Sequence, residues 1–119
     1  MTATPNAFKI YIRLLHDCDI AMGPGKADLI EAIERHGSLS AAAKVMDISY
    51  RRVWAMVESM NAGFKEPLVA TAHGGAKGGG ASVTPFGHEV LRLYRTLQTE
   101  ANDLTLRHFE HIKPLMKAD

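Results

Sequence analysis

The feature that most constrains this chain is an alanine-rich stretch followed closely by an amphipathic pattern. Residues 39–46 hold three consecutive alanines, and Ser38 before them is typical of a helix N-cap. Asp47-Ile48 separates this stretch from a second helical pattern, which begins after Ser49 and ends at Gly63. Small side chains in the first helix allow two helices to cross closely at a steep angle. The sequence therefore predicts two helices joined by a tight turn.

The spacing within this segment fits a helix-turn-helix. Ala43 provides a small side chain in the first helix, Asp47 stands at the turn position, and Val53 provides an apolar side chain in the second helix. Asp accepts the left-handed region of φ and ψ more readily than most residues other than glycine. We therefore expect a helix-turn-helix over about residues 38–63, with Asp47 at a positive φ.

The second helix of this segment has two contrasting faces. One face collects the apolar side chains Val53, Met56, Val57, Met60 and Phe64. Arg51 and Arg52 fall on the opposite side, in the first turn. Tyr50 lies near the edge of the apolar face and Trp54 on its flank, and we expect Trp54 and the methionines in the core. Two arginines at a helix start suit contact with phosphate or guanine, although a solvated face is the ordinary interpretation of such a helix alone.

A glycine-rich hairpin is predicted after this helix. Residues 67–72 and 81–84 favour strands, and the loop between them, residues 73–80, holds five glycines and Lys77. The loop is not followed by Lys-Ser or Lys-Thr and leads into a strand, which disfavours a nucleotide-phosphate loop. Glycines permit backbone N–H groups to approach a sugar-phosphate chain closely. We expect a wing over about residues 67–84, in which Lys77 contacts DNA.

The remaining patterns complete a mainly α fold with a small β component. Residues 8–15 alternate in the manner of a strand, and a helix is expected from Lys26 to the glycine at position 37. Thr84-Pro85 is a strong helix start. We expect three parts: a winged helix-turn-helix domain over residues 1–84, a long C-terminal dimerisation helix over 85–113, and a tail over 114–119.

The C-terminal helix carries an apolar stripe broader than one small domain can cover. Five residues recur along it at alternating spacings of four and three: Val90, Tyr94, Leu97, Ala101 and Leu104. A helix from a second copy would bury this stripe, so we expect a homodimer through it. Packing against the first strand and helix of the same chain is the alternative. A two-fold dimer would place two DNA-reading helices ~34 Å apart and predict an inverted-repeat site.

Five segments carry a family resemblance: GSLSAAA from residue 37, ISYRRVW from 48, ESMN from 58, GGAKGGGA from 74 and VTPFG from 83. In the same order, over roughly residues 8–105, they resemble the N-terminal DNA-binding domain of the ModE-type, molybdate-responsive transcriptional regulators. That domain is a winged helix-turn-helix related to the one in LysR-type regulators, and the family dimerises through its C-terminal helix. The resemblance assigns DNA contacts to seven residues: Ser38, Ser40, Ser49, Tyr50, Arg51, Arg52 and Lys77.

Full-length members of that family also carry C-terminal oxyanion-binding domains that hold molybdate. A chain that stops at Asp119 leaves no room for such a domain, so we expect none, and the effector stays open. Three functions remain to be weighed. The residues favour a sequence-specific regulator of transcription that binds double-stranded DNA as a homodimer. The alternatives are a small oxyanion sensor with its ligand at the dimer interface, and a protein-interaction adaptor that has lost DNA binding.

Other classes of protein lack support in the sequence. His108 and His111 lie one helical turn apart, but no third ligand completes a metal site, and no triad or carboxylate pair indicates an enzyme or a cofactor. The single cysteine, Cys18, allows no internal disulfide and fits a reducing compartment. Because no signal peptide precedes the domain and no apolar run approaches the ~20 residues of a membrane span, we expect a soluble cytoplasmic protein.

Overall fold

The structure is a computed structural model and describes residues 7–72 and 80–117. Its elements follow the chain in this order: β1 (Leu14–His16), β2 (Asp19–Met22), α1 (Pro24–His36), α2 (Leu39–Met46), α3 (Tyr50–Gly63), β3 (Val69–Thr71), β4 (Ala81–Val83), α4 (Pro85–Ile112) and the 3-10 turn η1 (Lys113–Leu115). Strands β1 and β2 pair antiparallel, and so do β3 and β4. The predicted fold class, mainly α with a small β component, is confirmed.

Hydroxyl side chains begin three of these helices. Ser38 Oγ accepts a hydrogen bond of 3.0 Å from a backbone N–H in the first turn of α2, and Ser49 Oγ accepts one of the same length in α3. Thr84 Oγ1 accepts a hydrogen bond of 2.9 Å from the first turn of α4. Each hydroxyl satisfies an N–H group that a helix start leaves without a partner. These bonds explain why the three helices begin where the sequence predicts.

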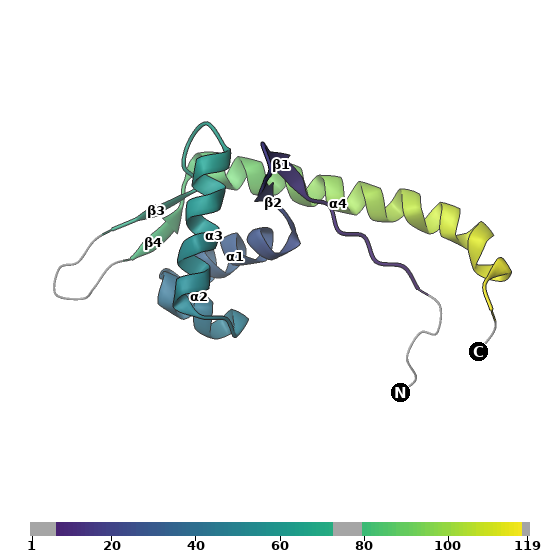
Figure 1. The fold of residues 1–119 in the computed structure, drawn as a ribbon, viewed down its shortest axis with the longest axis horizontal. Helices are drawn as coiled ribbons and strands as arrows, with labels where there is room; N and C mark the ends of the chain where they lie inside the picture. Colours follow the sequence, from purple (N-terminus) through teal and green to yellow (C-terminus); the bar gives the residue numbers. More distant parts are fainter. Residues whose placement is uncertain (1–6, 73–79, 118–119) are drawn as a thin grey trace.

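One core cluster joins the four helices. Its largest fully buried side chains are Met22, Leu29, Ile30, Ile33, Val53, Met60 and Leu68. They come from β2, α1, α3 and the segment before β3, and Leu91 and Tyr94 of α4 belong to the same cluster. Figure 1 shows α3 in front of α1, with α2 at the lower end of α3 and α4 running out to one side. The helix-turn-helix and the first half of α4 therefore share their apolar contacts.

The predicted strand over residues 8–15 is wrong in extent. Only β1 pairs, with β2, across a turn in which Asp17 has a φ of 56°. Residues 7–13 have no regular secondary structure and run beside α4, where the Tyr94 hydroxyl donates a hydrogen bond of 2.6 Å to the Ile12 carbonyl. A strand needs a partner for its backbone groups, and β2 is only four residues long. Over residues 7–13, half-buried and exposed side chains alternate, but the backbone does not pair with another strand.

Charged side chains fasten α4 to α1. Arg95 donates two hydrogen bonds to Glu31, from Nε to Oε2 at 3.0 Å and from Nη2 to Oε1 at 2.8 Å. The same Nη2 donates to Asp28 Oδ1 at 2.8 Å. The hydrogen bonds and the charge of Arg95 lower the pKa of the Glu31 carboxyl. Both polar and apolar contacts therefore fix the direction of α4 relative to the helix-turn-helix.

Helix α4 projects well beyond the core. The molecule measures 60 × 34 × 24 Å, and its radius of gyration is 17.6 Å, against about 13.5 Å for a compact chain of this length. The buried residues of α4, Gly87, Leu91 and Tyr94, all lie in its first half. Farther along, the rings of Phe8 and Phe109 pack edge to face with centroids 5.4 Å apart. The rest of the projecting half is largely exposed (Figure 1).

Gly87 marks the closest approach between α4 and the chain that enters β3. The Leu68 carbonyl accepts a hydrogen bond of 2.9 Å from the Thr84 N–H and lies directly over Gly87. A methyl group at Gly87 would overlap this carbonyl oxygen and come within 3.0 Å of Val83 Cγ1. Position 87 therefore requires glycine, because the Leu68 carbonyl leaves no room for a side chain.

We expect Gly87→Ala to lower the free energy of unfolding by about 1–3 kcal/mol, because the new methyl group must displace backbone atoms. Gly25→Ala, in the first turn of α1, is the matched control, since the nearest atom is Met56 Cε at 3.9 Å. That variant should match or slightly exceed the stability of the wild type. Urea denaturation of the three proteins measures the effect, and equal stability of the two variants would contradict this account.

Candidate nucleic-acid interface

The turn between α2 and α3 adopts the left-handed geometry that the sequence predicts. Asp47 has a φ of 59° and a ψ of 45°. Its N–H donates to the Lys44 carbonyl at 3.3 Å, and the Ile48 N–H donates to the Ala43 carbonyl at 3.1 Å. These bonds close the last turn of α2, and Ser49 then starts α3. The predicted helix-turn-helix and the role of Asp47 within it are confirmed.

Helix α3 buries one face and presents the other. Val53 and Met60 are fully buried and Val57 is 3% exposed, whereas Arg51 and Arg52 are exposed. None of the ion pairs among the described residues involves either arginine. Two guanidinium groups without a carboxylate partner therefore stand in the first turn of α3. This is the charge and the position that contact with a phosphate or with a guanine edge requires.

The predicted serine contacts fall into two groups. Ser38 and Ser49 cap α2 and α3, so each hydroxyl oxygen already accepts a backbone hydrogen bond, and each retains its O–H for donation outward. Ser40 is exposed in the first turn of α2. All three lie close in sequence to the helix starts, where backbone N–H groups also favour an anion.

The expectation that Trp54 lies in the core is wrong. Its side chain is 40% exposed, and Tyr50, one turn earlier on the same helix, is 54% exposed. On a helical wheel Trp54 falls about 90° from the centre of the buried stripe, and the described elements cover that flank only in part. Two aromatic rings therefore stand beside the arginines. Their place on the flank of the wheel was the sequence signal for this, and their size made a core position the simpler interpretation.

Asn61, which sequence analysis did not single out, fixes the hairpin to α3. Its Oδ1 accepts hydrogen bonds from the Leu68 N–H at 2.8 Å and the Val69 N–H at 3.3 Å, and its Nδ2 donates to the Val69 carbonyl at 3.0 Å. Strand β3 then pairs with β4 from Val69↔Val83 to Thr71↔Ala81. A buried-side Asn in the last turn of a helix before a strand is the signal that could have indicated this role. The predicted contact residue Lys77 lies outside the described residues.

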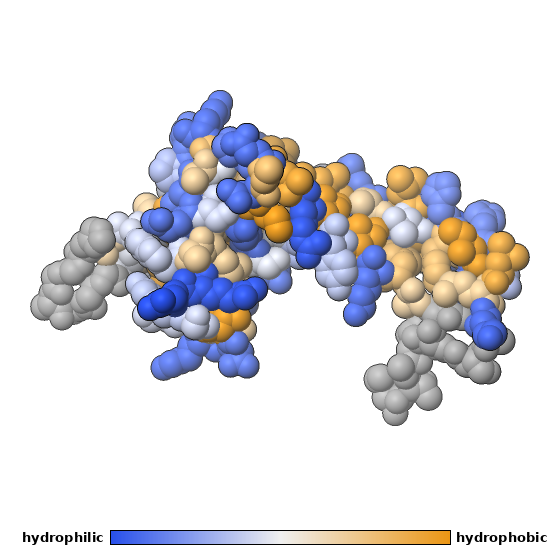
Figure 2. Space-filling model, viewed as in Figure 1, coloured by the Kyte–Doolittle hydropathy of each residue, from blue (hydrophilic) through white to orange (hydrophobic). Residues whose placement is uncertain are grey.

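The predicted dimer residues form one stripe along α4, but its two ends have different surroundings. Tyr94 is 2% exposed and Val90 packs against the core cluster of its own chain, so a partner cannot bury Tyr94 further. Leu97 and Leu104 are 41% and 50% exposed, and Ala101 between them is half-buried. Figure 2 shows hydrophobic residues gathered over the projecting half of α4 and hydrophilic residues over the lower end of α3. The alternative of packing within one chain holds for the first half of the stripe only.

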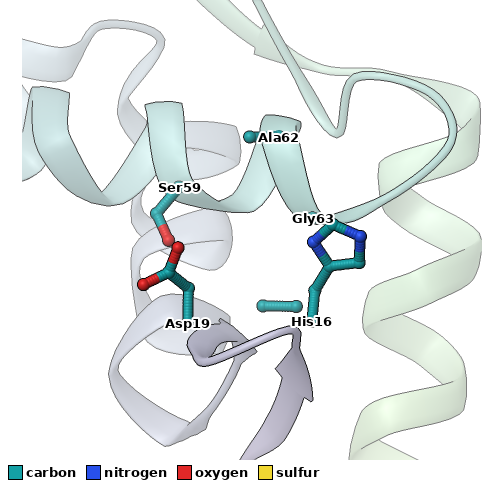
Figure 3. A pocket seen from close by; sticks show the side chains of 6 residues that line it. His16, Asp19, Ser59, Ala62 and Gly63 are labelled. Carbon is teal, nitrogen blue, oxygen red and sulfur yellow. The ribbon is translucent and has the colours of Figure 1, made fainter.

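A hollow of about 220 Å³ lies between the β1–β2 hairpin and the last turns of α3 (Figure 3). His16 and Asp19 reach it from the hairpin and Ser59 from α3. The Ser59 hydroxyl donates to the Ile20 carbonyl at 3.2 Å and so holds the hairpin to the helix. Over residues 7–72 and 80–117, no three His, Cys, Asp or Glu side chains are grouped to hold a metal ion. The polar side chains at this hollow are therefore explained by the contact between the β1–β2 hairpin and α3.

These features define a winged helix-turn-helix, with a helix whose cationic first turn faces outward and a hairpin attached to its end. The sequence profile of the bacterial regulatory helix-turn-helix proteins of the lysR family matches residues 26–88. The chain belongs to this family. Within the parts of the chain that the structure covers, no helix combines the length and apolar content needed to cross a membrane.

Two curated proteins and one crystal structure show the relationship in more detail. The molybdenum transport protein ModE of Azotobacter vinelandii is 36% identical over 121 residues, covering 100% of this chain and 43% of that protein. The DNA-binding transcriptional dual regulator ModE of Escherichia coli strain K12 is 38% identical over 74 residues, covering 62% of this chain and 28% of that one. The crystal structure of ArgP from Mycobacterium tuberculosis matches 74% of this chain with 31% of its own, at a TM-score of 0.51 and 25% identity.

This chain thus spans less than half the length of the ModE proteins it matches. The resemblance to ModE-type regulators that the motifs indicate is confirmed by these alignments. The shared segment relates this chain to one part of those proteins, and what they bind through their other parts is said of them alone.

Asp47 offers a test of the turn. We expect Asp47→Val to lower the free energy of unfolding by about 1–2 kcal/mol, because a β-branched side chain fits the left-handed region poorly. Asp47→Gly should be at least as stable as the wild type, since glycine enters that region without steric cost. Urea denaturation compares them. If the valine and glycine variants were equally stable, the positive φ would have no energetic role.

Proposed function

We propose that this chain is a sequence-specific regulator of transcription that binds double-stranded DNA as a homodimer. The observation that carries the proposal is the orientation of α3, in which Val53 and Met60 point into the core while Arg51 and Arg52 stand exposed without carboxylate partners. A helix held in this way can enter a major groove with its first turn against the base edges. The printed name of the related ModE of Escherichia coli, a DNA-binding transcriptional dual regulator, supports the same function.

In this proposal, the residues around α3 divide the work of recognition. Arg51 and Arg52 read guanine or hold phosphates, because a guanidinium can donate two parallel hydrogen bonds to either. The exposed rings of Tyr50 and Trp54 make apolar contact with thymine methyl groups or with sugars. Ser38, Ser40 and Ser49 donate to phosphates, and Lys77 contacts the backbone from the wing.

The exposed part of the apolar stripe on α4, from Leu93 to Leu104, is the proposed dimer surface. Leu93, Leu97 and Leu104 are 53%, 41% and 50% exposed, and they lie within about 40° of one another on a helical wheel. Ala101 lies beside them and leaves room for a close helix-to-helix approach. Burial of apolar side chains of this size contributes about 1.5–3 kcal/mol each relative to exposure. An antiparallel or crossed pair of α4 helices would cover the stripe and relate two copies of α3 by a two-fold axis.

DNA binding provides the first test. Arg51→Ala and Arg52→Ala should each weaken binding to a duplex selected from a random pool by about 1–3 kcal/mol, if the side chain reads a base. A gel-shift titration measures the affinities. Arg35→Ala, an exposed arginine in the last turn of α1, serves as the control and should bind as tightly as the wild type. Wild-type affinity in both α3 variants would remove the central residues from the proposal.

The dimer provides the second test. Leu104→Glu should shift the protein from dimer to monomer, because it places a charge within the proposed apolar interface. Leu106→Glu is a closely matched control: Leu106 is 48% exposed, against 50% for Leu104, and two residues along a helix it faces the opposite side. Sedimentation velocity at micromolar concentration measures the assembly state. A monomeric wild type, or dissociation of the Leu106 variant alone, would contradict the assignment of this surface.

A further inference from the structure

A second cationic site lies beside α3, outside the helix-turn-helix pattern. A surface hollow of about 310 Å³ opens between the segment before β1, the start of α1 and the first half of α3. Three cationic side chains line it: Arg13 from the N-terminal segment, Lys26 from α1 and Arg52 from α3. The other lining residues are apolar, aromatic or glycine, and no carboxylate is among them. Elements far apart in sequence thus bring three positive charges to one concave surface.

The charges of this hollow are largely uncompensated. Among the described residues, no ion pair within 4.0 Å involves any of its three cations. The guanidinium carbon of Arg13 lies 5.7 Å from the centroid of the Tyr11 ring, so a cation–π contact restrains the side chain at the rim. Asp19 is the carboxylate whose charge acts on Lys26. An anion in the hollow would find three cationic side chains that have no ion-pair partner among the described residues.

Lys26 shows that the hollow removes a charge partly from water. Its Nζ donates a hydrogen bond of 2.8 Å to the Ile20 carbonyl, which leaves two of the three ammonium protons free. Burial lowers the pKa of Lys26, and the charge of Asp19 opposes that shift. An anion beside Nζ would favour the charged form and accept the free protons.

We infer that this hollow binds a phosphodiester group of the DNA backbone, next to the groove that α3 enters. The inference rests on the proposed function and extends its contact surface. Arg52 belongs both to the hollow and to the exposed first turn of α3, so the two surfaces are continuous. Arg13 and Arg52 are exposed and Lys26 is half-buried, which suits a phosphate held in place by the rest of a bound duplex. Arg13 also lies outside residues 26–88, the segment shared with the lysR family.

The test compares two double variants of the full chain. Arg13→Gln with Lys26→Met removes two charges of the hollow and keeps an unbranched aliphatic stem at both positions. Lys9→Gln with Arg35→Met removes two charges from the same segment and the same helix, at exposed positions outside the hollow. Affinities are measured by fluorescence anisotropy over a range of KCl concentrations, for a selected duplex and for a scrambled one. Thermal unfolding establishes that both variants are folded.

We expect the hollow variant to bind both duplexes about tenfold more weakly, because it loses charged hydrogen-bond donors to a phosphate. The plot of log K against log salt should become less steep, its negative slope losing about one unit of magnitude, the value for one lost phosphate contact. The control variant should lose less than half as much in both measurements. A hollow variant that matches the control, or that loses affinity for the selected duplex only, would overturn the inference.

Two further outcomes distinguish failure of this inference from failure of the proposed function, and a DNA phosphate from a free anion as the ligand of the hollow. If the wild type retains neither duplex at low salt, both the inference and the proposed function fail, whereas intact binding by the hollow variant removes the inference alone. Inorganic phosphate and chloride are also compared as competitors at equal ionic strength. If the hollow binds the DNA backbone, phosphate and chloride should compete equally well. Stronger competition by phosphate against the wild type, lost in the hollow variant, would assign the hollow to a free oxyanion instead.

Discussion

The burial of one face of α3 is the constraint on which the rest of this structure depends. Val53, Val57 and Met60 fill the core against α1, α2 and β2, so the helix cannot rotate without exposing them. Rotation by half a turn would move about three large apolar side chains into water, at roughly 1.5–3 kcal/mol each. Arg51 and Arg52 therefore face outward because other residues of the same helix must face inward. The residues of the proposed recognition surface are exposed because they lie on the face of α3 opposite the buried one.

The same core sets the direction of α4. Tyr94 and Leu91 belong to the cluster that holds α3, and Arg95 ties the next turn to Glu31 and Asp28 of α1. Beyond Arg95, α4 leaves the domain with Leu97 and Leu104 exposed. A dimer formed there would inherit its geometry from these contacts, because a rigid helix transmits the angle at which it leaves the core. The spacing between two copies of α3 would follow from that angle.

Residues whose role is to position the backbone were the hardest to predict. Asn61 binds the backbone on both sides of Leu68, and Gly87 makes room for the Leu68 carbonyl, yet neither belongs to a hydrophobic period or a charge pattern. Helix caps were easier, since Ser38 and Ser49 act on residues three positions away. The first strand was overestimated for a related reason. Alternation in the sequence records which side chains face inward, and it does not show whether the backbone finds a partner.

The sequence by itself determined where α2, α3 and α4 begin, the left-handed turn at Asp47, the two faces of α3 and the breadth of the apolar stripe on α4; α1 begins at Pro24, two residues before the expected start. These depend on contacts within a few residues and on periodicity, which a linear sequence carries directly. Only the tertiary structure decided that Tyr94 is buried in its own chain while Leu104 is exposed, that Trp54 is exposed, and that Arg13, Lys26 and Arg52 line one hollow. Those outcomes depend on which elements cover one another in space, because a side chain is buried by its neighbours and not by its own position in a pattern.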